Sequence, residues 1–295
     1  MRLYIIVGPT CSGKTSAACL LSDYLNKAKI INLDAFQIYK DMDIGTAKLK
    51  KDDKYYDRHL LLDIKSPEET YSIKEFQDTF RNILKEYKDE EYLIAVGGSG
   101  LYLAAGLYDY HFDEEDELDT SDLDELDNEK LYDILTKLDP KAAEGIHPNN
   151  RKRVLRAIVI ARSGNKLKSE NAMEVKHTPY IDKNTYKIFF INPNREELYK
   201  RINERVDQMI KDGLIEEVKG LLKKYKLSLT ASQAIGYKEI ISYLNGEMSK
   251  EDAVELIKKR TRNYAKRQVT FFKHQFDTTI VKDYKEILGI IKDER

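Results

Sequence analysis

Cysteine is scarce in this chain of 295 residues, which contains two, Cys11 and Cys19. Two thiols so close in sequence exclude the disulfide framework of a small secreted protein and favour a reducing compartment. Long hydrophobic runs are also absent, because no stretch approaches the roughly 20 apolar residues of a transmembrane helix. The first residues, one arginine and then an apolar run, do not have the pattern of a signal peptide. We therefore expect a cytoplasmic protein with no membrane partner.

Metal-binding patterns are lacking as well. The five histidines include no H-x-x-x-H pair and the chain has no C-x-x-C, so a zinc site is not expected. The formal net charge of −1 gives no overall attraction to nucleic acid, but the two signs are segregated. Residues 109–129 contain twelve acidic residues and no Lys or Arg, whereas residues 256–276 contain seven Lys or Arg and no acidic residue. This segregation predicts a basic working face.

A phosphate-binding motif is the strongest signal in the sequence. The motif G-x-x-x-x-G-K-[ST] is complete and consists of Gly8, Pro9, Thr10, Cys11, Ser12, Gly13, Lys14 and Thr15. An apolar run at 3–7 predicts a buried strand before it, and apolar spacing over 16–25 predicts a helix after it. In that setting loop N–H groups and the helix N-terminus bind an anion, Lys14 places its charge on phosphates, and the Thr15 hydroxyl can ligate Mg²⁺. A nucleoside triphosphate is the default ligand of such a loop.

The order of strand and helix signals predicts an α/β fold with a P-loop NTPase-like parallel sheet. Further strands are expected at 30–34, 92–96 and 186–191. A helix is expected at 72–88, with Ser72 as N-cap and Glu75 completing a capping box.

A long helical excursion interrupts the predicted sheet. Helical patterns at 129–138, 140–145 and 150–163 predict an inserted subdomain over residues 109–183. The catalytic core would then consist of residues 1–108 and 184–295. Its C-terminal part is predicted to be mainly helical, at 195–211, 214–225, 238–245 and 250–273.

Polar residues follow two of the predicted strands. Asp34 ends the second strand, and strand carboxyl ends form the ligand crevice of a doubly wound sheet. Asp34 can hold Mg²⁺ through water, or it can act as a general base beside a bound electrophile. Gln37 and a neighbouring aromatic residue can read and stack on a base, although a surface glutamine and a packed aromatic explain them as well. Ser99 follows Gly97-Gly98 near the same crevice.

Three basic segments favour a polyanionic partner. Each alone is explained equally well by a solvated helix face, but together they favour nucleic acid. The first contains Arg151, Lys152, Arg153, Arg156 and Arg162, the second contains Arg201 and Arg205 at i and i+4, and the third contains Lys258, Lys259, Arg260, Arg262, Lys266 and Arg267 interleaved with Tyr264, Phe271 and Phe272.

Nine segments that span nearly the whole chain resemble the bacterial tRNA dimethylallyltransferases, or tRNA isopentenyltransferases, of the IPP transferase family. The segments at 41–48 and 264–270 are far more specific than a phosphate loop. In chain order they are GPTCSGKT at 8–15, LDAFQIY at 33–39, DMDIGTAK at 41–48, HLLLDI at 59–64, VGGSGLY at 96–102, IHPNN with R-x-x-R at 146–156, LYKRINERV at 198–206, QAIGYKE at 233–239 and YAKRQVT at 264–270.

This resemblance implies prenyl transfer to tRNA. The dimethylallyl group of dimethylallyl diphosphate would move to the N6 amine of the adenosine 3′-adjacent to the anticodon, in tRNAs that read codons starting with U. The phosphate loop would hold the diphosphate of the donor, with Mg²⁺ as cofactor, rather than ATP. The adenosine would be flipped out of the anticodon stem-loop into the core. We expect the enzyme to be a monomer.

Residue roles follow from the same resemblance. Thr10 matches the residue that contacts the bridging oxygen of the diphosphate, Asp34 matches the base that takes the amine proton, and Arg205 matches a diphosphate clamp. Contacts with tRNA are implied for Asp34, Ala35, Phe36, Gln37 and Ser99, and for Lys152, Arg153, Val154, Leu155 and Arg156. The chain departs from the family pattern at His59-Leu60, at Phe271 in place of a tryptophan, and in the acidic stretch at 109–129, where relatives usually carry an arginine that touches tRNA.

Two other enzymes remain as alternatives. A P-loop kinase or NTPase would use Asp34 to hold the metal and the basic segments to bind a phosphorylated substrate. An adenylate isopentenyltransferase would prenylate free nucleotides, and its resemblance is confined to the N-terminal half. The basic C-terminal helices and the segment at 264–270 favour tRNA over a free nucleotide.

Overall fold

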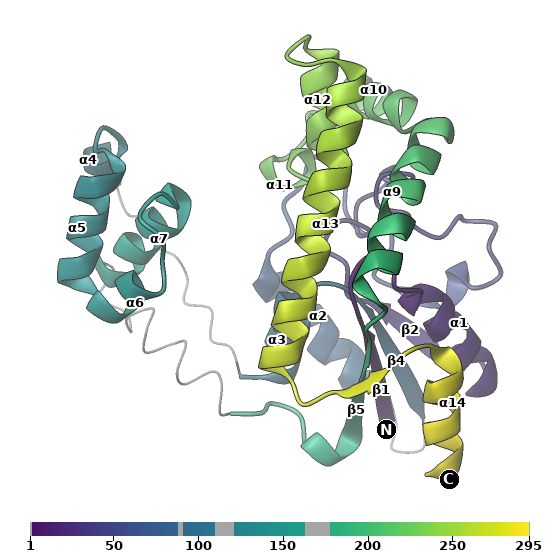
Figure 1. Ribbon diagram of the computed structural model, residues 1–295. Helices are drawn as coiled ribbons and strands as arrows, with labels where there is room; N and C mark the ends of the chain where they lie inside the picture. Colours follow the sequence, from purple (N-terminus) through teal and green to yellow (C-terminus); the bar gives the residue numbers. More distant parts are fainter. Residues whose placement is uncertain (1, 88–90, 110–120, 163–177, 295) are drawn as a thin grey trace. The chain divides into compact units, whose positions relative to one another are not determined.

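The computed structural model describes residues 2–87, 91–109, 121–162 and 178–294 (Figure 1). It divides into two compact units. The core unit consists of Met1–Gly106 and Asp182–Arg295, and the insert is Leu107–Ile181. From the sequence we expected these boundaries at 108/109 and 183/184. Within the described residues, no helix has the length and apolar character needed to cross a membrane.

A six-stranded parallel sheet forms the centre of the core unit, in the order β3-β2-β4-β1-β5-β6. The strands are β1 Arg2–Val7, β2 Lys29–Asn32, β3 His59–Leu60, β4 Tyr92–Gly97, β5 Tyr186–Ile191 and β6 Thr279–Val281. The expected parallel α/β fold is confirmed. β3 and β6 were not predicted, because strands of two or three residues are too short to show a periodic pattern.

The second strand ends earlier than the sequence pattern predicted. It stops at Asn32, because the chain turns immediately afterwards. The N–H of Asp34 donates to Oδ1 of Asn32 at 3.2 Å, and the Asn32 amide donates to the carbonyls of Asp34 and Leu61 at 3.3 and 3.2 Å. Such local side-chain bonds compete with strand pairing. Asp34 therefore lies in a turn beyond the strand end.

Helices cover both faces of this sheet (Figure 1). On one side, α1 (Lys14–Tyr24) and α14 (Tyr284–Asp293) bury Leu21 and Ile287 against Tyr4 and Ile6 of β1. On the other side lie α2 (Ile73–Glu86) and α3 (Gly100–Leu107). The strands carry apolar residues on both faces, as expected of a sheet that is covered by helices on each face. The predicted capping box of α2 is present, with Ser72 Oγ accepting from Glu75 N–H at 3.1 Å.

The C-terminal part of the core unit is mainly helical, as predicted. In Figure 1, α9 and α13 run alongside each other, and Ile202 of α9 packs with Ala265 of α13. Phe272, near the end of α13, lies 5.8 Å from the ring of Phe190 in β5 and so fixes this helix to the sheet. The helices are α9 Arg195–Lys211, α10 Leu214–Lys224, α11 Leu229–Ser232, α12 Tyr237–Leu244 and α13 Lys250–Gln275.

The insert has a hydrophobic core of its own, formed by Leu123, Leu131, Leu135, Val154, Ala157 and neighbouring residues. Its helices are α4 Ser121–Asp124, α5 Asn128–Leu138, α6 Pro140–Glu144 and α7 Arg151–Arg162. The helices predicted at 129–138, 140–145 and 150–163 are confirmed within one residue at each end. Part of the acidic stretch is structural, because Asp127 caps α5 and Asp122 pairs with Arg162 at 2.9 Å. Residues 110–120 of that stretch lie outside the described residues.

Candidate active site

The phosphate-binding loop connects β1, a central strand, to α1. Cys11 and Gly13 adopt positive φ angles of 62° and 86°, so the loop curls with alternating hand, which turns N–H groups inward. A Cβ at Gly8 would lie 2.7 Å from the Ile191 carbonyl oxygen, so only glycine fits there. Gly13 is the N-cap of α1 and provides no side-chain cap. The first N–H groups of α1 therefore remain available for an anion.

Lys14 is partly buried beside this loop. Its Nζ donates to the Pro9 carbonyl at 3.2 Å. The pKa of Lys14 is lowered to about 8, mainly by burial; the charge of Asp34 opposes this shift and Arg205 adds to it. A buried ammonium next to a second cation is unfavourable until an anion arrives, so the site is suited to binding a multiply charged phosphate.

Helix α9 brings Arg205 to the loop. Nη1 of Arg205 lies 3.6 Å from Sγ of Cys11, and both residues line a cavity of about 130 Å³ together with Thr10, Lys14 and Asp34. Arg201 is one helical turn earlier but is exposed and pairs with Glu197. Of the two arginines that the sequence placed on one helix face, Arg205 is therefore the one that reaches the phosphate-binding loop.

Asp34 is held by its own turn. Its Oδ1 accepts hydrogen bonds from the N–H groups of Phe36 at 2.9 Å and Gln37 at 3.4 Å. Two donors on one carboxylate oxygen fix the plane of the carboxylate, and Asp34 lines the same cavity as the loop residues Thr10 and Lys14. A carboxylate with a fixed direction can accept a proton from a substrate bound in that cavity.

The segment 41–48 closes another side of the cavity through Gly45 and Thr46. Glu217 of α10 fastens it: Oε2 accepts from the N–H groups of Asp43 and Ile44 at 3.0 and 2.7 Å, and Oε1 accepts from Gly45 N–H at 3.2 Å. The hydroxyl of Tyr237 in α12 donates to the same carboxylate at 2.6 Å. One side chain from the helical part thus holds three successive backbone N–H groups of the cavity wall.

A second, polar pocket of about 60 Å³ adjoins the first and is lined by Thr15, Asn32, Asp34 and His59 among others. His59 Nδ1 lies 2.8 Å from the Tyr55 carbonyl and must carry the proton, since a carbonyl only accepts. Burial lowers the pKa of His59, so the ring is neutral and Nε2 has a lone pair. This buried Nε2 has no hydrogen-bond partner among the described residues. The pocket, which His59 helps to line, is large enough to hold a water molecule that donates a hydrogen bond to Nε2.

This polar pocket fits a magnesium site of the P-loop kind. No group of three or more His, Cys, Asp or Glu side chains gathers around a possible metal position in the described part of the chain. Mg²⁺ typically keeps several waters and takes few protein ligands besides phosphate oxygens. The Thr15 hydroxyl can serve as a protein ligand, and the other polar side chains that line this pocket can hydrogen-bond to metal-bound water.

The expected tRNA-contacting residues of the core unit lie in different surroundings. Phe36 lines the cavity, whereas the Gln37 amide donates to the carbonyls of Thr46 and Ala47 at 3.0 and 3.5 Å and so supports the cavity wall. Ser99 precedes α3, and its Oγ accepts from Tyr102 N–H at 3.4 Å. The structure therefore gives Gln37 and Ser99 internal roles at the edge of the site.

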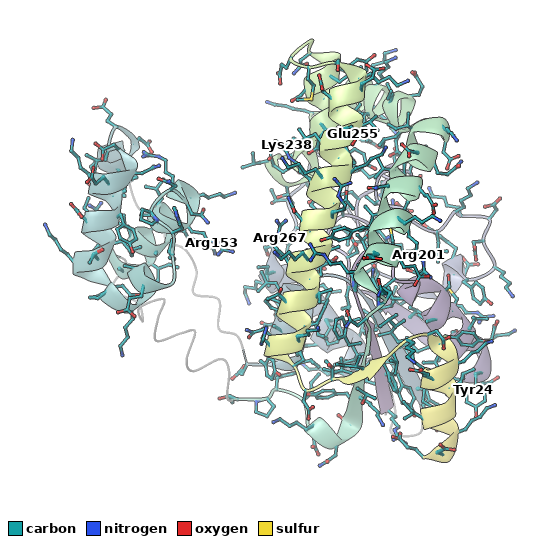
Figure 2. The ribbon with its side chains drawn as sticks, in the orientation of Figure 1. Tyr24, Arg153, Arg201, Lys238, Glu255 and Arg267 are labelled. Atoms are coloured by element: carbon teal, nitrogen blue, oxygen red, sulfur yellow. The ribbon has the colours of Figure 1, made fainter. Side chains whose placement is uncertain are left out.

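The basic helix of the insert separates into structural and exposed residues. Arg151 donates to the backbone carbonyls of Leu123 at 3.0 Å and Asp124 at 2.8 Å, which joins α7 to α4. Lys152 and Arg153 are exposed, as Figure 2 shows for Arg153. Val154 is fully buried in the core of the insert, with Leu155 packed against that core. Lys152 and Arg153 can thus meet a ligand directly, whereas the buried Val154 side chain instead stabilises the helix.

Basic residues of the C-terminal helices also line surface depressions. Lys238 of α12 and Arg267 of α13, both labelled in Figure 2, share one shallow pocket with Arg260 and Asn263. The guanidinium of Arg267 lies 5.6 Å from the ring centre of Tyr264. Other basic residues of α13 are paired internally: Lys258 lies 2.8 Å from Asp207, and Arg262 donates to Asn203 at 2.6 Å.

Three residues of this region were not assigned a role from the sequence: Glu217, His59 and Gln268. Gln268 lies within the segment YAKRQVT, and His59 within HLLLDI, but neither spacing indicates a contact with the phosphate loop or the polar pocket. Glu217 has the pattern of a solvent-facing helix residue. Their positions depend on tertiary packing, so a single sequence gives no signal for them.

The phosphate loop follows a central parallel strand and lines one cavity together with the fixed Asp34 carboxylate and Arg205. These features define a P-loop protein with a candidate active-site cavity. The family model described as "IPP transferase" matches residues 37–275. The chain is 40% identical to the tRNA dimethylallyltransferase of Anoxybacillus flavithermus, covering 99% of this chain and 96% of that protein. It is 44% identical to the tRNA dimethylallyltransferase of Alkaliphilus oremlandii, over 92% and 88% of the two chains.

Solved structures agree with these sequence relatives. The tRNA Δ(2)-isopentenylpyrophosphate transferase of Staphylococcus epidermidis matches with a TM-score of 0.70 and 36% identity, over 100% of this chain and 99% of that one. A eukaryotic dimethylallyltransferase acting on tRNA matches with a TM-score of 0.80 and 27% identity, over 100% and 79%. The chain belongs to the IPP transferase family. The family and fold class predicted from the sequence are confirmed, and the predicted activity matches the names of these relatives.

Proposed function

We propose that this chain transfers the dimethylallyl group of dimethylallyl diphosphate to the N6 amine of the adenosine 3′-adjacent to the anticodon in tRNAs that read codons starting with U. The observation that carries the proposal is the composition of the main cavity. Its lining combines Thr10 and Lys14 of the phosphate loop with Arg205 of α9, and it also includes apolar side chains such as Ile202, Val206, Met209 and Ile257. A cationic, anion-binding cradle next to apolar side chains suits a short prenyl diphosphate.

The reaction would be a displacement at the allylic carbon C1. The C1–O bond to the diphosphate breaks while a bond from N6 to C1 forms, and the leaving diphosphate keeps the electron pair. Negative charge grows on the bridging oxygen, where a Thr10 hydrogen bond and the Arg205 and Lys14 charges stabilise it. Asp34 accepts the N6 proton. The apolar side chains of the cavity would limit the access of water to the allylic electrophile.

Mg²⁺ is proposed as the cofactor, held by the Thr15 hydroxyl and the donor's phosphate oxygens. When bound, it neutralises diphosphate charge and so improves the leaving group. His59 Nε2 and Asp34 are positioned to accept hydrogen bonds from water in the polar pocket.

The acceptor is proposed to be the anticodon stem-loop of tRNA. Supporting residues are the exposed cations Lys152 and Arg153 of the insert and the basic pocket with Lys238 and Arg267 in the core unit. Phosphate contacts of this kind give strong but salt-sensitive affinity. A monomeric enzyme in the cytoplasm, where tRNA is used, completes the proposal.

The test combines purified protein, Mg²⁺ and labelled dimethylallyl diphosphate with three acceptors: an anticodon stem-loop, the same stem-loop lacking the target adenosine, and AMP. We expect prenylated RNA and an equal amount of diphosphate with the first acceptor only. Product on AMP but not on RNA would identify an adenylate isopentenyltransferase. Consumption of ATP in a parallel assay, with no prenylated product, would identify a kinase or NTPase.

A further inference from the structure

Gln268 joins three parts of the core unit at one point. It lies on α13, is 6% exposed, and reaches both the phosphate loop and the turn after β4. Its Oε1 accepts the backbone N–H of Thr10 at 2.9 Å, and its Nε2 donates to the Gly98 carbonyl at 2.9 Å. The helix, the diphosphate loop and the strand end are therefore linked through a single amide.

The chemistry of these two bonds requires an amide. Thr10 offers a donor and Gly98 an acceptor, so the bridging group must accept on one side and donate on the other, which also fixes the orientation of the amide. A glutamate at this position would have the same shape but two acceptor oxygens, and one of them would be repelled by the Gly98 carbonyl oxygen. A Cβ at Gly98 would lie 2.1 Å from Gln268 Nε2, so glycine is needed for the amide to reach its position.

The bond to Gln268 decides what Thr10 offers to a ligand. Its N–H points to Oε1 and so does not take part in the anion cradle, which leaves the hydroxyl as the polar group that Thr10 can present in the cavity. The same bond limits rotation of the Thr10 backbone, because Gln268 is anchored at its other end to Gly98.

We propose that Gln268 is a positioning residue that holds Thr10 so that its hydroxyl meets the bridging oxygen of the donor diphosphate. This inference rests on the proposed prenyl transfer. It also connects the loop to α13, the helix that carries Tyr264 one turn earlier in the same cavity and Arg267 in the basic pocket. Gln268 touches the loop rather than the reacting atoms, so its effect on the reaction acts through Thr10.

A double-mutant cycle tests this role. Gln268→Met removes both hydrogen bonds at similar volume, and Thr10→Ala removes the hydroxyl. We expect Gln268→Met to lower the single-turnover rate of prenyl transfer about 10- to 100-fold in the otherwise unchanged enzyme, since it leaves buried polar groups unsatisfied. In the Thr10→Ala background the same substitution should cost less than about threefold, because the hydroxyl it positions is already gone.

Equal losses in both backgrounds would overturn the inference, since a purely structural glutamine acts independently of the Thr10 hydroxyl. Gln268→Glu, which keeps the shape and the acceptor for Thr10 N–H, serves as the second variant if Gln268→Met unfolds. Because its carboxylate loses the bond to the Gly98 carbonyl, the anchor that fixes Thr10 is lost, and this variant should also cost less in the Thr10→Ala background. Gln275→Met on the exposed last turn of α13 is the control and should leave the rate unchanged. Absence of product with the unchanged enzyme would instead contradict the proposed function.

Discussion

At the scale of single residues, the site separates charge stabilisation from proton transfer. Lys14 and Arg205 lie beside the phosphate loop, whereas Asp34 is held by its own turn on another part of the cavity wall. In the proposed reaction, the cations would stabilise the leaving diphosphate, and the carboxylate would accept the amine proton. Each role can be removed separately, so each gives its own experimental signature.

Replacing Asp34 tests the proposed base. Asp34→Ala should lower the single-turnover rate ~10²–10⁴-fold, the usual contribution of a general base. Affinity for the anticodon stem-loop should largely survive, because Asp34 carries no positive charge for phosphate contacts. Rapid-quench prenyl transfer and an RNA-binding titration measure the two quantities, with Asp52→Ala at an exposed position as control. A large fall in RNA affinity with an unchanged single-turnover rate would show that Asp34 binds RNA and is no base.

The lowered pKa of Lys14 gives a pH dependence of donor binding. With a pKa of about 8, Lys14 is mostly charged at pH 7 and mostly neutral at pH 9. If the charged form binds the diphosphate, the affinity for an unreactive donor analogue should fall about tenfold between these pH values. Lys14→Arg keeps its charge throughout, so calorimetry on this variant isolates the lysine from titration of the ligand. An identical pH dependence in both proteins would contradict the assignment.

Lys14 also affects the stability of the ligand-free fold, which should increase with pH, whereas the affinity for the donor should decrease. Its folded-state pKa lies below the unfolded value of about 10.5, so the unfolded chain binds more protons between pH 8 and 10.5. The free-energy cost of holding the charged Lys14 in the fold is present in full below pH 8, and it decreases as the pH rises from 8 to 10.5. Lys14 therefore weakens the fold in the same pH range in which its charged form is proposed to bind the donor.

At the scale of elements, helix α10 supports the wall of the active-site cavity. The Glu217 carboxylate accepts three backbone N–H groups from the segment 41–48 and the Tyr237 hydroxyl. Successive N–H groups around an anion form a nest, which loses its acceptor if the carboxylate is removed. The cavity wall is thereby tied to the helical part of the core unit.

Substituting Glu217 should disturb this wall more than the fold. We expect Glu217→Gln to reduce kcat/KM for prenyl transfer about 10-fold or more, because its amide NH₂ cannot accept the N–H groups that the second carboxylate oxygen accepted. Steady-state kinetics and thermal unfolding are the measurements. Glu216→Gln on the same turn is the matched control, since Glu216 is exposed and pairs with Lys219. Equal activity of the two variants would rule out this role for Glu217.

Most elements of the fold could be predicted from the sequence, because their signals are local. The strand at 186–191 is a short apolar run, the helix at 195–211 has apolar residues at helical spacing, and both have the predicted bounds. β3, β6 and the short helix α11 lack a periodic signal, since each is a few residues held by tertiary contacts. The phosphate loop was predictable because its eight residues form one motif. Gln268 and Glu217 were not, because their partners are 258 and about 170 residues away.

At the scale of the whole molecule, the two units have separate cores and separate proposed tasks. The insert buries Leu131, Leu135 and Val154 around its own helices, and the core unit contains the phosphate loop and the cavity. The residues proposed for catalysis and the exposed residues proposed to bind RNA can therefore be substituted independently.

The insert should contribute affinity for RNA but none for the donor. Lys152→Gln/Arg153→Gln should weaken binding of the anticodon stem-loop and reduce the slope of log affinity against log salt by about one to two, as loss of two phosphate contacts predicts. Affinity for the diphosphate donor should not change. Lys137→Gln/Lys141→Gln removes two other exposed charges of the insert and is the control. Equal weakening by both pairs would indicate nonspecific attraction.

The proposed reaction changes the nucleoside composition of cellular tRNA, which nucleoside analysis of total tRNA measures. Cells in which the gene is deleted are compared with the same cells carrying it again on a plasmid, either unchanged or with Asp34→Ala. We predict that N6-dimethylallyladenosine and nucleosides made from it disappear on deletion, return with the unchanged gene, and do not return with the variant. Unchanged levels of these nucleosides after deletion would contradict the proposed transfer of the dimethylallyl group to tRNA.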